Sequence, residues 1–260
     1  MKKRFIILLY ILLFSCICVY SYKSQNVKKN IKINKINLVN ELSKEKLLSY
    51  DVISEHDKNS DIKKKLCNIK NWYFEVVENF LTDEECNKII EIGKPNLVNS
   101  LVANPNKNQV DNKVRTSTQY WIHRNKDPLL MKIAKKVSDK VKIPIENQEK
   151  LQILHYDPGQ FYKKHYDACI DNTKNCNDDF KKRGPRDITT FIYLNDVNDG
   201  GETAFNNVGI KVRPKKGTAI FWRNLDDTKT KRHPCSLHQA LVPNEEKWAL
   251  TVWSRVKKQF

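Results

Sequence analysis

The chain has 260 residues and a formal net charge of +17, which is enough length for one sizeable domain plus an appendage. Residues 1–70 hold 15 Lys and Arg against 6 Asp and Glu, so more than half of the excess positive charge precedes the part expected to fold as a domain. No recognised nucleic-acid motif accompanies this charge, so nucleic acid is not an expected partner.

The first 22 residues predict a secretory signal peptide or a signal-anchor. Lys2, Lys3 and Arg4 precede an uncharged apolar run over residues 5–20. This run is shorter than the about 20 residues that span a bilayer, so cleavage after Ser21 and retention as a tilted anchor both fit. Positive charge before the run favours a cytosolic N-terminus and a domain that faces a lumen. We therefore expect the endoplasmic reticulum lumen or membrane, as a single-pass type II protein if the leader is retained. The alternatives are the wider secretory pathway, or the cytosol if the leader does not function.

The composition then divides the remaining chain into two parts. Residues 23–70 are rich in Lys, Asn and Ser and contain neither Pro nor Gly, which predicts a polar stalk. Residues 71–260 form the expected domain, because regular apolar patterns begin near Trp72. A strand is predicted over residues 72–77.

Two helices should follow this strand. Thr82 and Glu85 form a capping box that begins the first helix, and Gly93 marks its expected end. Asp127 is the expected N-cap of the second helix, which carries Pro128 in its first turn and ends before Pro144. One apolar stripe runs along this second helix and predicts packing against a core: Leu129, Leu130, Ile133, Ala134, Val137 and Val141.

From residue 151 the apolar period shortens to that of strands. The segments with strand character are residues 151–156, 188–194, 218–222 and 248–256, separated by turns that contain Pro or Gly. Helices followed by short strands predict an α+β domain whose strands form a sandwich or barrel.

Five cysteines lie outside the apolar leader: Cys67, Cys86, Cys169, Cys176 and Cys235. An odd number means that at least one thiol is free or pairs with another molecule if the others bond. Cys169 and Cys176 enclose six residues of a polar loop, and we hypothesise that they pair. A zinc site is the competing interpretation, which the absence of a second nearby cysteine pair disfavours.

His165 and Asp167 are a histidine and a carboxylate two residues apart, and His238 follows 71 positions after the aspartate. In an extended strand residues i and i+2 project from the same face, so the first two side chains can bind one ion while a later strand brings in the third. Two imidazoles and one carboxylate leave open positions on an octahedral ion, the arrangement of non-haem Fe(II) oxygenases. Such a pair also arises by chance among solvated residues, so its surroundings must decide.

Lys247 follows His238 by nine residues and lies in an apolar strand. A buried cation there needs a partner of opposite charge. The alternative is a lysine at a strand end that extends its ammonium group to solvent.

Most of the chain resembles a known family. Residues 72–256 contain, in order, short motifs that are individually common: Asn79-Phe80-Leu81-Thr82, Val114-Arg115-Thr116-Ser117, Gly159-Gln160-Phe161-Tyr162, His165-Tyr166-Asp167, Gly200-Gly201-Glu202-Thr203, Pro214-Lys215-Lys216-Gly217 and Ser236-Leu237-His238. In this series the chain resembles the prolyl 4-hydroxylase alpha-subunit type of 2-oxoglutarate and Fe(II)-dependent dioxygenases, especially the short membrane-associated form of plants. The resemblance implies a double-stranded β-helix, or jelly roll, core with flanking helices packed on one sheet.

The resemblance also implies roles for particular residues. His165, Asp167 and His238 would bind Fe(II), and the distal carboxylate of 2-oxoglutarate would meet Lys247. The remaining implied contacts are to 2-oxoglutarate, from Tyr156 and Thr251, and to a peptidyl proline, from Tyr162, Arg186 and Trp253. Trp253 could equally be a core residue. Dioxygen would be the second co-substrate, and ascorbate would rescue uncoupled turnovers.

The resemblance therefore implies hydroxylation of proline in a polypeptide to 4-hydroxyproline, coupled to decarboxylation of 2-oxoglutarate to succinate. One alternative keeps the cofactors but oxidises peptidyl lysine or a small molecule. Another is a catalytically silent jelly-roll binding module, although the four intact residues of the implied iron and 2-oxoglutarate sites argue against it. The sequence names neither the acceptor protein nor a partner subunit.

Overall fold

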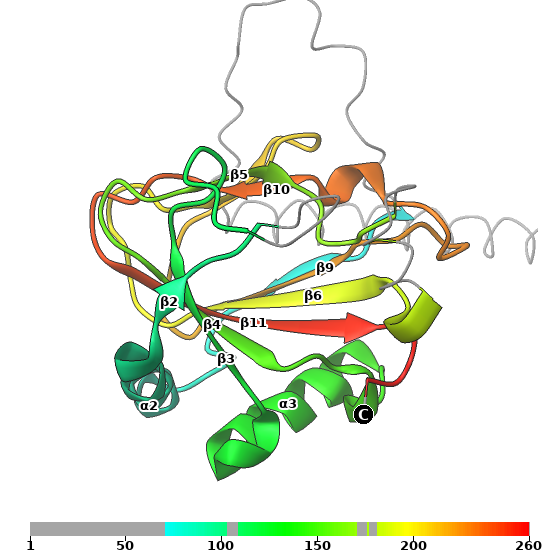
Figure 1. Cartoon of the computed structure of the whole chain (residues 1–260), viewed down its shortest axis with the longest axis horizontal. Helices are drawn as coiled ribbons and strands as arrows, with labels where there is room; N and C mark the ends of the chain where they lie inside the picture. The colour runs from blue at the N-terminus through cyan, green and yellow to red at the C-terminus, as the bar shows by residue number, and fades with distance from the viewer. Residues whose placement is uncertain (1–70, 103–108, 171–175, 177–180, 260) are drawn as a thin grey trace, which may run out of the picture. The chain divides into compact units, whose positions relative to one another are not determined.

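The computed structural model describes residues 71–102, 109–170, 176 and 181–259 (Figure 1). The expected leader, residues 1–22, and the expected stalk, residues 23–70, lie outside the described residues. Within the described ranges, no helix combines the length and apolar character needed to cross a membrane.

The larger of two antiparallel sheets has seven strands, in the order β1-β9-β6-β11-β4-β3-β2. Their bounds are β1 Phe74–Val77, β2 Val98–Asn99, β3 Thr118–Ile122, β4 Leu151–Tyr156, β6 Arg186–Tyr193, β9 Ala219–Arg223 and β11 Lys247–Arg255. The three central strands β6, β11 and β4 are almost wholly buried, because both faces of this sheet are covered.

The smaller sheet has four short strands in the order β5-β10-β7-β8, namely β5 Tyr162–His165, β10 His238–Ala240, β7 Thr203–Phe205 and β8 Ile210–Val212. Its strands come from segments between those of the larger sheet, so the chain passes repeatedly from one sheet to the other. The two sheets form the double-stranded β-helix core that the resemblance implied.

The two helices α2 (Asp83–Gly93) and α3 (Pro128–Val141) lie on the side of the larger sheet away from β5 and β10 (Figure 1). The capping box is confirmed, because Thr82 Oγ1 accepts from the Glu85 backbone N–H and the Glu85 side chain accepts from that of Thr82. Asp127 caps α3 as predicted, accepting from the Leu129 N–H at 2.8 Å. Short 3-10 helices complete the described part: η3 Lys94–Asn96, η4 Arg124–Lys126, η5 Ile145–Asn147 and η6 Pro234–Ser236.

The main hydrophobic core lies between the helices and the larger sheet. Leu130, Ile133 and Val137 of the predicted stripe are at most 1% exposed, and they pack in one cluster with Ile153 of β4 and Leu250 of β11. This packing leaves the opposite face of the larger sheet free to face the smaller one.

Cys169 and Cys176 form a disulfide with a Cα–Cα distance of 5.3 Å, which confirms the hypothesised pair. Cys235 is disulfide-bonded as well. Cys86 is a buried free thiol at the interface of α2 with the sheet.

Candidate active site

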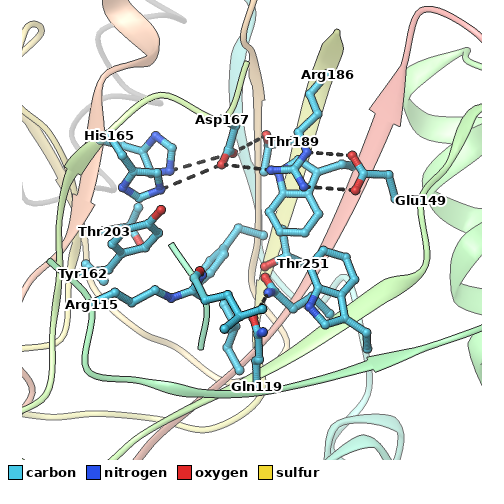
Figure 2. Close-up of a pocket in the computed structure, with 18 of the residues that line it drawn as sticks. Arg115, Gln119, Glu149, Tyr162, His165, Asp167, Arg186, Thr189, Thr203 and Thr251 are labelled. Carbon is cyan, nitrogen blue, oxygen red and sulfur yellow. Dashed lines mark hydrogen bonds and ion pairs between the residues drawn. The ribbon is translucent and has the colours of Figure 1, made fainter. Parts of the chain in front are cut away.

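Three side chains that the sequence singled out meet at one end of the smaller sheet. His165 ends β5 and His238 begins β10, and the two residues are directly opposed partners in the strand ladder. One ligand atom from each of His165, Asp167 and His238 lies within 4.8 Å of the others. Figure 2 shows His165 facing Asp167. Each histidine Nε2 lies 3.8 Å from an oxygen of the aspartate. The strand pairing therefore brings together residues that are 73 positions apart in the sequence.

The position of Asp167 differs in one respect from the expectation. The strand β5 ends at His165, and Asp167 lies in a bend beyond it, so strand alternation does not orient its side chain. Instead, the hydroxyl of Thr189 on β6 donates a hydrogen bond to Asp167 Oδ2 at 2.7 Å. The carboxylate is held by a neighbouring strand of the other sheet.

Both histidine rings are oriented by a backbone carbonyl at Nδ1, with Nε2 on the side of Asp167. His165 Nδ1 lies 2.8 Å from the Lys163 carbonyl, and His238 Nδ1 lies 2.8 Å from the Ser236 carbonyl. A carbonyl oxygen only accepts, so each Nδ1 carries a proton. Backbone acceptors on the remote nitrogen are a common feature of metal-binding histidines.

The electrostatics favour the forms of the side chains that bind metal. Burial, reinforced by His238, lowers the pKa of His165 well below its usual value, so the ring is neutral at neutral pH. Burial alone would raise the pKa of Asp167, but His238, His165, Arg186 and the Thr189 hydrogen bond together lower it to about 2. The cluster thus offers a neutral His165 imidazole and an ionised Asp167 carboxylate beside the His238 ring.

The cluster opens into a cavity of about 550 Å³ between the two sheets. This volume lies within the range of about 300 to 1,000 Å³ that is typical of small-molecule sites. Polar side chains line the cavity in addition to the cluster: Arg115, Gln119, Glu149, Gln152, Thr203 and Thr251. Tyr156, Tyr162, Arg186 and Trp253 also line it, so the structure brings together every predicted substrate residue.

Lys247 is fully buried at the start of β11 and is not among the residues that line the cavity. Its Nζ donates to the Gly201 carbonyl at 2.5 Å and lies 5.1 Å from the ring centre of Tyr156, a cavity residue. Burial lowers its pKa to about 7, opposed only by Glu202. Among the described residues no carboxylate forms an ion pair with it, so the predicted partner of this cation is not another side chain.

Of the predicted substrate residues, Tyr162 lies beside His165, whereas Arg186 lies on the other side of Asp167 (Figure 2). Tyr162 stacks on His165 with ring centres 3.6 Å apart. Trp253 stacks on Trp121 at 5.4 Å, and the guanidinium of Arg186 lies 3.7 Å from the Trp253 ring centre. Trp253 is 5% exposed and therefore well buried, yet it forms part of the cavity wall, so it is more than a core residue.

Comparison with known proteins agrees with this geometry. Residues 151–255 match the family model described as the 2OG-Fe(II) oxygenase superfamily. A putative prolyl 4-hydroxylase of Acanthamoeba polyphaga mimivirus is 33% identical over 184 residues, covering 70% of this chain and 74% of that protein. Prolyl 4-hydroxylase 5 of Arabidopsis thaliana is 38% identical over 205 residues, covering 70% of this chain and 67% of the relative. The chain belongs to the prolyl 4-hydroxylase family of 2-oxoglutarate and Fe(II)-dependent oxygenases.

A solved structure extends the likeness to the fold. The viral collagen prolyl hydroxylase of Paramecium bursaria chlorella virus-1, determined with 2-oxoglutarate, shares 30% sequence identity and a TM-score of 0.57. The alignment covers 70% of this chain and 94% of that one. This prolyl 4-hydroxylase family member therefore has the jelly-roll core of 2-oxoglutarate oxygenases.

The cofactors of the family are Fe(II), 2-oxoglutarate and dioxygen, and the site residues fit them. The donor set of two imidazoles and one carboxylate is the one that Fe(II) oxygenases use. A buried lysine without a carboxylate partner fits the distal carboxylate of 2-oxoglutarate. Three further buried cavity atoms form no hydrogen bond in the described structure: Gln152 Oε1, Thr251 Oγ1 and Trp253 Nε1.

From the sequence, Glu149 could not be identified as a partner of Arg186 in this family member. Glu149, at the edge of the cavity, accepts from Arg186 at 2.6 and 3.0 Å and from Arg255 at 2.6 Å. Burial would raise the pKa of Glu149, but the two guanidinium groups lower it to about 2. The sequence carried one signal, an acidic residue just before a strand of apolar residues, but nothing in it identified the two arginines as its partners.

Gln119, Gln152, Thr189 and Arg115 were also missed as cavity residues. Gln152 Nε2 donates to Gln119 Oε1 at 2.5 Å across β4 and β3. The strand β3 that carries Gln119 was not predicted. The alternation of side chains along β3 could therefore not be used to place Gln119 in the cavity. Arg115 lies over the Tyr162 ring at 4.5 Å, in a motif that the sequence showed but to which no role was assigned.

Proposed function

We propose that this protein hydroxylates proline residues of a polypeptide to 4-hydroxyproline, with decarboxylation of 2-oxoglutarate to succinate. One observation carries the proposal: the cluster of His165, Asp167 and His238 opens into a cavity walled by aromatic rings, in a chain of the prolyl 4-hydroxylase family. Flat aromatic walls suit the proline ring, which is apolar and rigid.

In this proposal His165, Asp167 and His238 hold Fe(II). Bound Fe(II) would supply the redox chemistry that couples the splitting of 2-oxoglutarate to hydroxylation. The protein residues fix the three donors on one side of the ion, through the carbonyls of Lys163 and Ser236 and the hydroxyl of Thr189. The co-substrates would then approach the three donors from the cavity.

Lys247 would bind the distal carboxylate of 2-oxoglutarate, assisted by Tyr156 and Thr251. Two features support this role: among the described residues no carboxylate pairs with the buried Lys247, and none forms a hydrogen bond with the buried Thr251 hydroxyl beside the cavity. The ammonium has three N–H donors, so it can keep its hydrogen bond to the Gly201 carbonyl and also donate to a carboxylate. A carboxylate next to Lys247 would favour its charged form.

Tyr162, Trp253 and Arg186 would hold the peptide. The two rings offer apolar walls, and Arg186 has a guanidinium that is already fixed by Glu149 and by the face of Trp253. A guanidinium donates in several directions, so Arg186 can also donate to a peptide carbonyl.

The test uses the purified full chain with Fe(II), 2-oxoglutarate, dioxygen and ascorbate. The proposal includes stimulation of turnover by ascorbate. Proline-rich peptides are compared with matched peptides in which lysine replaces proline. We expect release of succinate with the addition of one oxygen atom to proline, and no reaction in the His165→Ala variant. Succinate release without proline oxidation would refute the substrate while leaving the cofactors in place.

We also propose that the domain acts in the lumen of the endoplasmic reticulum, where residues 1–22 would direct it or anchor it. The Cys169–Cys176 disulfide supports this compartment, because such bonds persist in oxidising environments. Protease treatment of sealed microsomes should leave the domain intact until detergent is added. Digestion without detergent would contradict the lumenal location.

A further inference from the structure

Asp167 is held by a directional chain of three hydrogen bonds that begins at Trp222. The indole Nε1 of Trp222 donates to Asn224 Oδ1 at 3.0 Å, and Asn224 Nδ2 donates to Thr189 Oγ1 at 2.7 Å. Thr189 in turn donates to Asp167 Oδ2 at 2.7 Å (Figure 2). Because an indole N–H only donates, it fixes which end of the Asn224 amide faces Thr189. The hydroxyl proton of Thr189 is therefore directed to Asp167.

The backbone of Asn224 reaches the other side of the cluster. Its carbonyl accepts from the His233 N–H at 2.8 Å, and the His233 carbonyl in turn accepts from Ser236 Oγ at 2.7 Å. Ser236 belongs to η6, and its own carbonyl accepts from His238 Nδ1 at 2.8 Å. Asn224 is thus connected to two of the three proposed ligands, to one through its side chain and to the other through its backbone.

Burial makes this arrangement specific. Asn224 is 0% exposed and Thr189 is 1% exposed, so no bulk water competes for their polar groups. The next residue of β6, Thr190, is also 0% exposed, but its hydroxyl has no hydrogen-bond partner in the described structure. Thr190 is therefore an adjacent buried threonine on the opposite face of β6 that has no link to Asp167.

We propose that Asn224 is a positioning residue, which acts through Thr189 to hold the Asp167 carboxylate in the orientation that binds the divalent metal. The inference rests on the proposed function, which assigns Asp167 to the metal. Neither Asn224 nor Thr189 would touch the ion. Removing their hydrogen bonds should weaken metal binding although all three donors remain.

The test measures the affinity of the full chain for Co(II) by calorimetric titration, in the absence of 2-oxoglutarate and peptide. Thr189→Val removes the hydroxyl at nearly constant shape and should weaken Co(II) binding about 10- to 100-fold. Thr189→Ser keeps a hydroxyl and should restore most of the affinity. Thr190→Val is the matched control and should bind as the wild type does. Circular dichroism confirms that each variant is folded.

A second variant tests whether Asn224 acts on Asp167 through Thr189. Asn224→Leu should reproduce the loss seen in Thr189→Val, and the double variant should bind no more weakly than the weaker single variant, because both act on one path. Wild-type affinity in Thr189→Val, or an equal loss in Thr190→Val, would overturn the inference and leave the proposed function intact. Failure of the wild type itself to bind Co(II) would overturn the proposed function, and the inference with it.

Discussion

Lys247 is a charged side chain that the fold buries completely, and this costs stability when no anion is bound. Burial lowers its pKa from 10.5 to about 7, so between these values the unfolded chain binds a proton that the folded chain does not. The free energy of unfolding of the wild type should therefore rise from pH 7 to pH 10.5. Below pH 7 the full cost of burying the charged lysine is present.

Lys247→Met should remove this dependence. At pH 7 the variant should be more stable than the wild type, by at most roughly 5 kcal/mol, and the difference should shrink toward pH 10. Urea unfolding at several pH values measures it, with the exposed Lys135→Met as control. The same variant should require much more 2-oxoglutarate for turnover. A stability difference that does not change with pH would show that Lys247 is already charged in the folded protein.

Glu149 is the opposite case, a buried carboxylate with two cationic partners. Glu149→Gln would leave Arg186 and Arg255 without their shared anion, and we expect a loss of about 3 to 5 kcal/mol in unfolding free energy at neutral pH. The pKa of Glu149 is lowered from 4.5 to about 2, so its contribution is present above pH 4.5 and disappears as pH falls toward 2.

Acid unfolding of the two proteins tests this account of Glu149. The stability of Glu149→Gln should fall less steeply below pH 4.5 than that of the wild type, and its KM for a proline peptide should rise because Arg186 loses one of the contacts that fix its guanidinium. The exposed Glu146→Gln is the control. Parallel acid limbs for Glu149→Gln and the wild type would contradict the lowered pKa.

Chemical type and spacing pointed to the cluster, and the resemblance to a known family supplied the aromatic walls. Neither was sufficient for Glu149, Thr189 or Asn224, because their roles depend on partners that lie 22 to 106 positions away. A buried glutamate and a strand threonine look ordinary until the fold supplies those partners.

At the scale of elements, Gly93 shows how a correct boundary can have an unexpected cause. Gly93 ends α2 as predicted, but its φ of −73° is that of an ordinary helical residue, and the chain continues into η3. A Cβ at this position would lie 2.7 Å from Ile153 Cγ2 on β4. The glycine therefore allows close approach of helix and sheet.

Gly93→Ala consequently sets two effects against each other. Helix propensity alone favours alanine by about 1 kcal/mol. Contact with Ile153, which is 0% exposed and cannot move aside, should cost more, and we expect net destabilisation of about 1 to 3 kcal/mol. Adding Ile153→Ala should reduce the penalty of Gly93→Ala, as measured by a double-mutant cycle in urea. If the Gly93→Ala variant were more stable than the wild type, helix propensity would outweigh the contact with Ile153.

The helices α2 and α3 and five of the seven described strands of the larger sheet could be predicted from the sequence, whereas β2, β3 and the strands of the smaller sheet could not. Each predicted element of the larger sheet is confirmed within about two residues, because a buried strand must be apolar along its length. The strands of the smaller sheet have only 3 or 4 residues, too few to show a period, and β5 carries two exposed lysines. Only pairing with neighbouring strands defines them.

This contrast has a consequence for the whole molecule. The larger sheet is supported by two helices and a continuous hydrophobic core. None of the described residues of the smaller sheet belongs to this core, although Phe205 of β7 packs against Trp222. Two strands of the smaller sheet, β5 and β10, carry the two histidines of the cluster. A bound divalent ion would connect β5 and β10 more firmly than their few ladder hydrogen bonds, so it should stabilise this sheet in particular.

Removal of the metal should therefore loosen one sheet and not the other. With Co(II) bound, backbone amides of β5 and β10 should exchange slowly with deuterium, and after chelation they should exchange much faster. Amides of β4 and β11 should change little, because the helix-backed core protects them independently of the ion. His165→Ala is the control, since its exchange pattern should be the same with and without Co(II). Uniform loss of protection across both sheets on chelation would show that the ion stabilises the fold as one cooperative unit and that the smaller sheet has no separate dependence on the metal.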